Sequence, residues 1–465
     1  MSGSAARPAA ASGHARDGLP RPRRYIAIAA VSLGTILTTA DGSIVNVALP
    51  TLARDLHVQA ASAVLVVTIY QLVLMTAMLP CSALSDRFGH RATYQYGQML
   101  FVAATLLCFF ARSLPFLVVV RGIQALGAAA AMSVSSAMLR SIYPSAQLGR
   151  GLGFNTVIAA SAASLAPTAG GALLAVAHWP WLFAMVVPFG IFSILIGRQS
   201  LPEGTRHSNP FDVLGATMCA ATFGLVISGL ESAVHGDSPV VSAALVASGV
   251  VIGSYFVRRE LGQARPILPV DLLRLRRVAL PCAGSLAAYC GMMIVTVTLP
   301  FRLQQQFHFT PASAGLVLAP LPLVSLIVAP TSGLLSDRWP AGMLGAIGMS
   351  IAAAGMISVA FLPVAPDHSD IAWRVAVCGL GTGMFFSPNA RQVVAAAPLE
   401  RAAAAGALFT SIRGAGQTFG ATTVAALLAA GLGVSTAPPL IAAGLAVVAG
   451  LCSAATLFVA RSRRG

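Results

Sequence analysis

The sequence predicts an all-α membrane protein built from two related halves. Hydrophobic residues make up 57% and charged residues 9% of the 465-residue chain, and the mean hydropathy is +0.81. Most of the chain must lie in lipid, because soluble domains carry about 25% charged residues. The sequence Leu-Ser-Asp-Arg occurs at 84–87 and again at 335–338, each time at the end of a long apolar run. This repeat indicates equivalent turns in two halves, a common plan of membrane transporters.

Apolar stretches of roughly 20 residues predict fourteen membrane-spanning helices. In chain order they cover residues 26–49, 62–84, 92–111, 115–139, 151–176, 181–197, 212–231, 239–257, 278–300, 311–335, 342–362, 372–393, 403–430 and 438–460. The first six form one predicted bundle (25–200) and the last six another (278–461). Between them, 201–277 holds an inserted helix pair and a cytoplasmic linker. Residues 1–24 are predicted to be a disordered cytoplasmic tail, because they are rich in Ala, Pro, Gly and Arg without apolar periodicity.

The arginines indicate how the helices are oriented, since all 29 basic residues are arginine. If the N-terminus lies in the cytoplasm, 23 of them face the cytoplasm, as the positive-inside rule requires. The exceptions are four that face outward and two within helices, namely Arg54, Arg112, Arg302, Arg374, Arg121 and Arg413. We therefore predict a multi-pass protein of a bacterial cytoplasmic (inner) membrane with both termini in the cytoplasm. The net charge of +15 reflects this topology, whereas nucleic-acid binding would need one continuous basic face.

The histidines and cysteines argue against catalysis. All eight histidines lie in tails, loops or predicted helix ends. The seven cysteines lie in apolar segments, without the spacing of a metal site or a disulfide framework. The chain has no lysine, which removes Ser/Lys chemistry. We predict that the protein is not an enzyme and that it uses no cofactor and no metal.

Asp41 is the strongest candidate for a functional residue. It is the only acid well inside a predicted span, because Asp212 and Glu231 sit at the ends of the segment 212–231. An ionised carboxylate at membrane depth costs about 2.5 to 3.5 kcal/mol on insertion scales. Its protonation can therefore be exchanged for a bound cation or coupled to a conformational change. The alternative is a permanently paired structural aspartate that caps backbone amides.

Two arginines inside the predicted spans need partners. Arg121 shares the outer half of the membrane with Asp41, and Gln124 lies one turn further along the same helix face. Arg121 can form a fixed ion pair or a carbonyl anchor that holds the first and fourth helices together. Arg413 lies near the middle of 403–430 among small residues, which favours a bond to a neighbouring helix over a substrate contact.

Further polar and aromatic residues are candidates to line a central cavity, although each can equally join neighbouring helices. They are Asn46, Tyr70, Gln71, Asn155, Tyr289, Asn389, Arg413 and Gln417.

Several segments carry a resemblance to a known family. Asp41–Pro50 (DGSIVNVALP) closely resembles the first-helix signature of the 14-helix drug:proton antiporters of the major facilitator superfamily. Ser82–Arg91 is similar to that superfamily's loop motif between helices 2 and 3, and Arg121–Gly127 to its fourth-helix basic motif. Pro167–Gly171 resembles the end of the antiporter motif. Trp179–Phe183 resembles another family feature, a pair of tryptophans that encloses one residue. The resemblance covers about 25–460.

The chain departs from these motifs at a few positions. The loop motif has Ser82 in place of glycine and His90 in place of a basic residue. The antiporter motif has alanine at Ala162 and Ala166 where glycine is usual, and Pro180 stands where the family has arginine.

The resemblance implies a major facilitator fold, with two six-helix bundles plus two inserted helices. It also implies export of amphiphilic small molecules in exchange for protons by alternating access, with proton-coupled uptake or export of a specific metabolite as the alternative. The expected partners are a small-molecule substrate, protons and the lipid bilayer, without nucleic acid. We expect a monomer, and assistance by envelope proteins stays open.

The resemblance also implies roles for particular residues. Arg121 would assist proton movement near Asp41, and the antiporter motif would comprise Pro167, Gly170 and Gly171. A cytoplasmic gate would be latched by the two loop-motif copies, at Asp86, Arg87, Arg91, Asp337 and Arg338. The plain alternative for the loop motif is that its basic residues only enforce topology.

Overall fold

The computed structural model describes residues 18–144, 147–203, 212–236, 238–263, 266, 268–398 and 401–461. Most of the predicted tail (1–17) and parts of the predicted insert and linker (204–211, 237, 264, 265 and 267) lie outside the described residues.

The first half of the chain forms six long helices. Backbone polar groups in lipid need internal hydrogen bonds, and a helix supplies them within one segment. The six are α1 (Arg23–Asp55), α2 (Ala60–Phe88), α3 (His90–Phe109), α4 (Leu114–Ile142), α5 (Leu148–Leu174) and α6 (Trp181–Ser200). The inserted pair follows as α7 (Val213–Val234) and α8 (Pro239–Leu261).

The second half repeats this plan with some irregular turns. A 3-10 helix, η2 (Val270–Arg274), precedes α9 (Arg276–Phe301), and a π-helix, η3 (Arg302–Gln306), continues it. The remaining helices are α10 (Pro311–Leu318), α11 (Pro320–Leu335), α12 (Ala341–Ala360), α13 (His368–Ala396), α14 (Ala402–Ala429) and α15 (Ala437–Arg461).

The predicted helix over 311–335 is broken into α10 and α11. The break falls at Ala319, because the following Pro320 has no N–H to donate into the helix. Within the described residues, eleven spans are long and apolar enough to cross a membrane. The others, α3, α13 and α14, are equally long but carry more polar side chains. The predicted all-α membrane fold is confirmed.

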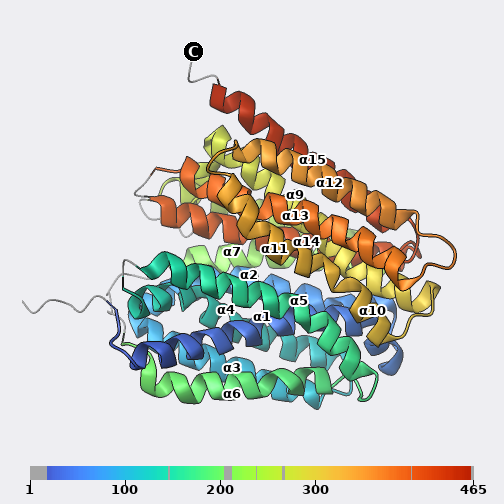
Figure 1. The fold of residues 1–465 in the computed structure, drawn as a ribbon, viewed down its shortest axis with the longest axis horizontal. Helices are drawn as coiled ribbons and strands as arrows, with labels where there is room; N and C mark the ends of the chain where they lie inside the picture. The colour runs from blue at the N-terminus through green and yellow to red at the C-terminus, as the bar shows by residue number, and fades with distance from the viewer. Residues whose placement is uncertain are drawn as a thin grey trace, which may run out of the picture.

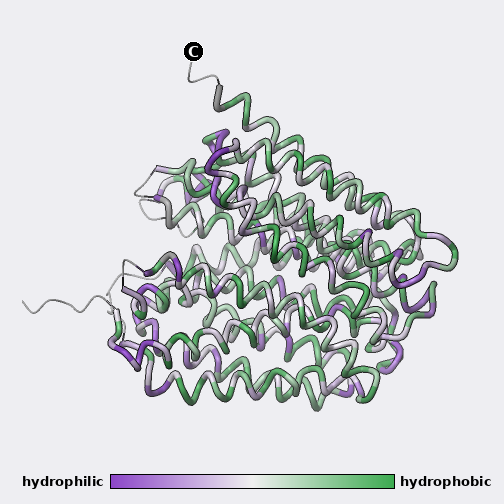
Figure 2. The backbone as a smooth tube through the Cα atoms, in the orientation of Figure 1, coloured by the Kyte–Doolittle hydropathy of each residue, from purple (hydrophilic) through white to green (hydrophobic). Residues whose placement is uncertain are grey.

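Figure 1 shows the two bundles lying side by side, α1 to α6 in one and α9 to α15 in the other. They meet where α2 packs against α14 and where α5 packs against α10 and α11. Because α7 contacts both α2 and α14, this helix lies across the seam between the halves, and α8 packs against α7. In Figure 2 hydrophilic residues gather at the two ends of the bundles and hydrophobic residues lie between them, as a membrane requires.

The two ends of the molecule differ. We call the end at which α1 begins and α15 ends the terminal end, and the opposite one the far end (Figure 1). Toward the far end, Gln304 Nε2 donates to the Val47 carbonyl oxygen at 3.0 Å, and Thr168 Oγ1 donates to the Gly315 carbonyl oxygen at 3.2 Å. Each bond joins one bundle directly to the other.

Toward the terminal end, a cavity of about 510 Å³ separates the bundles. It lies between α2 and α4 on one side and α14 on the other, where Ser82, Arg140 and Ser411 line it. Among the described residues, no side-chain ion pair links the two bundles at this end. The two bundles are thus bonded directly to each other toward the far end and lie apart around this cavity toward the terminal end.

Candidate functional site

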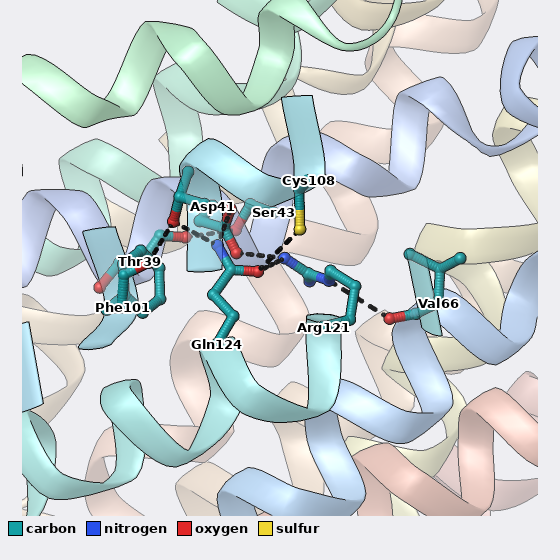
Figure 3. A network of polar contacts seen from close by, with 9 residues as sticks. Thr39, Asp41, Ser43, Val66, Phe101, Cys108, Arg121 and Gln124 are labelled. Carbon is teal, nitrogen blue, oxygen red and sulfur yellow. Dashed lines mark hydrogen bonds and ion pairs between the residues drawn. The ribbon is translucent and has the colours of Figure 1, made fainter. Parts of the chain in front are cut away.

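A buried polar network joins α1 to α4 (Figure 3). Arg121 Nη1 donates to Asp41 Oδ2 and to Gln124 Oε1, each at 2.6 Å. Gln124 Nε2 donates to the other carboxylate oxygen, Asp41 Oδ1, at 3.0 Å. The relative exposure of these side chains is 0% for Asp41, 1% for Arg121 and 0% for Gln124. Both carboxylate oxygens therefore have a donor, although no water reaches them.

Further contacts anchor this network to two more helices, α2 and α3. Gln124 Nε2 donates to Thr105 Oγ1 of α3 at 2.8 Å, and Arg121 Nε donates to the Val66 carbonyl oxygen of α2 at 3.4 Å. The Arg121 guanidinium also lies over the Tyr70 ring at 4.2 Å, in cation–π geometry. A buried ion pair is tolerated only when such bonds satisfy its remaining donors and acceptors. The arrangement meets that condition.

Glycine brings α3 and α4 close enough for the network to form. A Cβ on Gly127 would lie 2.5 Å from the Phe101 backbone nitrogen, and one on Gly97 would lie 2.9 Å from the Gly127 carbonyl oxygen. Only glycine allows this approach. The close packing of α3 against α4 places Thr105 within hydrogen-bonding distance of Gln124.

A central cavity of about 220 Å³ lies between the two bundles, next to this network. Successive residues of a helix point about 100° apart, so Asp41 faces α4 while Gly42, Ser43 and Asn46 face the cavity. None of the described residues that line it is charged, and Asn46 Oδ1 is buried without a hydrogen-bond partner. The lining residues come from α1, α2, α5, α9, α10, α11 and α14: Gly42, Ser43, Asn46, Val47, Gln71, Ala163, Pro167, Tyr289, Met292, Met293, Val295, Thr296, Leu318, Leu321, Pro322 and Gln417.

The structure separates the cavity candidates of the sequence into two groups. Asn46, Gln71, Tyr289 and Gln417 line the central cavity, and Arg413 lies beside Tyr289.

The other three lie elsewhere. Tyr70 is buried against Arg121. The Asn155 side chain meets Thr35 of α1 at 3.0 Å. Asn389 is bonded within the second bundle, to Pro281 and Ser285.

The antiporter motif forms part of the far-end contact between the bundles. A Cβ on Gly171 would lie 2.5 Å from the Pro311 carbonyl oxygen of α10, so glycine is required there. A Cβ on Gly170 would lie 2.5 Å from Ile44 Cγ1 of α1, within the first bundle. Pro167, one turn earlier, lines the central cavity.

The first copy of the loop motif bonds within its own bundle. Asp86 Oδ1 lies 3.7 Å from His90 Nε2. Arg91 donates to Glu203 at 3.2 Å and to the Arg198 carbonyl oxygen. Arg87 is exposed in the last turn of α2.

The second copy behaves in the same way. Asp337 pairs with Arg391 of α13, and Arg338 follows it in the exposed turn after α11. The structure therefore places both copies at the terminal end, each bonded inside its own half.

Three residues of these sites were missed by sequence reasoning. Thr105 has no signal in the sequence, because a threonine in an apolar helix ordinarily bonds its own backbone. Gln304 belongs to a polar run that resembles an ordinary helix end. Glu231 lies at a helix end as predicted, in the last turn of α7, but its side chain is buried, which the sequence did not indicate.

Two helical bundles around a shared central cavity, with a buried ion pair beside it, define a membrane transporter. The family model of the Major Facilitator Superfamily matches residues 31–421. The chain belongs to this superfamily.

Relatives span most of the chain. It is 42% identical over 414 residues to the uncharacterized transporter YebQ of Escherichia coli K12, covering 89% of this chain and 91% of that one. It is 26% identical to the riboflavin transporter RibZ of Clostridioides difficile 630, covering 84% and 85%. It is 26% identical to the multidrug efflux pump LfrA of Mycolicibacterium smegmatis, covering 88% and 81%. A crystal structure of the peptide transporter POT in complex with sulfate shares the fold, with a TM-score of 0.73, 17% identity and 95% of each chain covered.

Proposed function

We propose that this transporter exports amphiphilic small molecules from the cytoplasm in exchange for protons, by alternating access. One observation carries the proposal: α1 holds Asp41 in the buried network with Arg121 and, on its next face, lines the central cavity. A change in the protonation of Asp41 therefore acts on a helix that also contacts the substrate. The similarity to a multidrug efflux pump supports this choice.

Proton binding would loosen the bond between α1 and α4. Protonated Asp41 is neutral, so Arg121 would lose its counter-ion and keep its contacts to Gln124, the Val66 carbonyl and the Tyr70 ring. The attraction lost is large, because charges interact strongly where water is excluded. The freed α1 can then change the shape of the cavity that it lines. The proton binds at Asp41 and the substrate binds in the cavity, and each affects the binding of the other through α1.

The cavity lining fits amphiphilic substrates. It combines methionines and apolar side chains with amide, hydroxyl and phenol groups, and its described residues carry no charge. Flexible methionines adapt to ligands of different shape, and a few polar groups orient them.

The orientation follows from the arginines. We place the terminal end in the cytoplasm, which makes this conformation inward-facing. The opposite conformation would break the far-end bonds from Gln304 and Thr168 and close the cytoplasmic end. Asp86 and Asp337, now paired inside their own bundles, would then latch the halves together.

Transport in vesicles with an imposed pH gradient tests the proposal. The substrates should include dyes, quaternary ammonium compounds and antibiotics. Asp41→Asn should abolish proton-coupled export, and Asp55→Asn, a matched change at the exposed end of the same helix, should not. Export that continues unchanged in Asp41→Asn would place the proton site elsewhere.

A specific metabolite is the second candidate substrate, and the similarity to a riboflavin transporter favours it. Competition assays distinguish the two candidates. If chemically unrelated compounds inhibit one another's transport, the protein is a multidrug exporter. If only close analogues inhibit transport, it carries a specific metabolite.

A further inference from the structure

A second acid is buried in the membrane region, at the seam between the bundles. Glu231 lies in the last turn of α7, and its side chain is only 8% exposed. Neither carboxyl oxygen has a hydrogen-bond partner within 3.5 Å, and the nearest donors are the hydroxyls of Thr68 and Thr422. Because α7 packs against α2 of one bundle and α14 of the other, this carboxyl lies where the two halves and the insert meet (Figure 1).

Each bundle contributes one hydroxyl to the surroundings of this carboxyl. Thr68 of α2 and Thr422 of α14 lie beside Glu231, and both hydroxyl oxygens are buried without a hydrogen-bond partner. Other threonines of the same helices, Thr76 and Thr418, donate to the carbonyl four residues earlier. The two hydroxyls near Glu231 are therefore free to serve it.

No cation neutralises this carboxyl within the described residues. Among the described residues, His235, on α7 itself, is the one titratable group that faces it. The imidazole Nδ1 is 2.8 Å from the Glu231 backbone carbonyl oxygen, and Nε2 is 3.1 Å from Ser62 Oγ, so the ring makes no ion pair with the carboxyl. From α2, α8 and α14, no charged side chain in the described part faces it. An ionised carboxylate here would be uncompensated, and the neutral acid fits this conformation.

We propose that Glu231 is a second proton-binding site of this transporter, and that its protonation controls closure of the far end. The site lies at the end that is closed here and that opens in the opposite conformation. When α2 and α14 separate there, water reaches the carboxyl and stabilises its charged form. Closing the far end again buries the carboxyl, which requires a proton. Low pH on the far side therefore favours closure. This inference rests on the alternating-access part of the proposed function.

A distance measurement across the far end tests the proposal without any transport. Val176 and Val364, which are 84% and 98% exposed in far-end loops of the two halves, are suitable positions for spin labels in a background without the native cysteines. The wild-type distance should lengthen as the pH rises. Glu231→Gln, a neutral isostere, should keep it short at every pH, whereas the control Asp55→Asn should behave like the wild type. Unchanged pH dependence in Glu231→Gln, or none in the wild type, overturns the proposal.

A second measurement needs no variant and decides the matter if Glu231→Gln does not fold. Dicyclohexylcarbodiimide reacts with protonated carboxyls in apolar surroundings, and the groove lined by Leu230, Phe419 and Thr422 lies next to Glu231. Mass spectrometry should find the adduct on Glu231 at low pH and a loss of it as the pH rises. Absence of the adduct at every pH overturns the proposal. Because neither measurement uses a substrate, failure of the export hypothesis would leave both results valid.

Discussion

Arg121 and Asp41 form an ion pair at 2.6 Å between α4 and α1, and neither side chain is exposed to solvent by more than 1%. A pair so deeply buried is costly to break, because removing one partner leaves the other charge uncompensated. The same property makes it suited to coupling, since one proton cancels the attraction that holds the two helices together.

The first prediction concerns the two members of this pair. Asp41→Asn should abolish proton-coupled transport and lower stability by about 3 to 5 kcal/mol, because Arg121 loses its counter-ion. The protein should still fold. Thermal unfolding in detergent measures the loss. The double variant Asp41→Asn with Arg121→Gln should recover part of the stability but none of the transport. No recovery in the double variant would mean that the pair does not act as a unit.

The second prediction concerns substrate charge. Neutral or monovalent lipophilic compounds should be exported better than divalent cations of similar size, because Asp41 can release only one proton for a cation and Glu231 is not among the residues that line the cavity. The described cavity lining offers no further acid, and Arg413 lies beside Tyr289 on its wall. Mono- and bis-quaternary dyes compared in vesicles with a pH gradient give the answer. Strong export of the divalent dye that does not depend on Asp41 would refute this account.

The third prediction concerns topology. Both tails and the linker 258–277 should lie in the cytoplasm, because the number of spans between them is even and the arginines gather at this end. Reporter fusions to each segment measure the side. An external signal from the linker would show that an odd number of helices crosses the membrane before it, so that the helix count is wrong.

The fourth prediction concerns the loop motif. Asp86→Asn should slow turnover by about fivefold, because an exposed ion pair is worth about 1 kcal/mol at most. Membrane insertion should change little, since Arg87 and Arg91 remain. Transport rate and the amount of protein in the membrane are measured side by side. A proportional fall in both would support the purely topological role of the motif.

The fifth prediction concerns the linker and pH. Arg401 bonds to Asp271 in η2 and holds the pKa of that carboxyl below its usual value of 3.8, against a smaller opposing effect of burial. Because the pKa of Asp271 is lower when η2 is held by Arg401, the ion pair stabilises this packing of η2 above pH 3.8. The stabilisation is lost as the pH falls further. Hydrogen exchange at 268–275, corrected for intrinsic rates, should be slower in the wild type than in Asp271→Asn at neutral pH. The difference should vanish in acid, and a difference that persists there would exclude this ion pair as its cause.

The sequence alone determined the helices and their division into halves. Spanning length and apolar composition are local properties, so the segments could be identified without knowledge of their neighbours. The repeat at 84–87 and 335–338 located equivalent turns in the same way. Asp41 stood out because an acid in an apolar run is rare. The break at Ala319 was also encoded locally, by Pro320, but one continuous apolar run concealed it.

Only the tertiary structure decided which atoms meet. Thr105 reaches Gln124 because glycines bring α3 and α4 together, and Gln304 reaches Val47 because η3 turns toward α1. Glu231 is buried because the inserted helix packs across both bundles, although its place near a helix end suggested exposure. Burial and hydrogen bonding depend on residues far apart in the chain. Hydropathy fixes which segments enter the membrane, whereas the packing of helix faces fixes which polar groups find partners there.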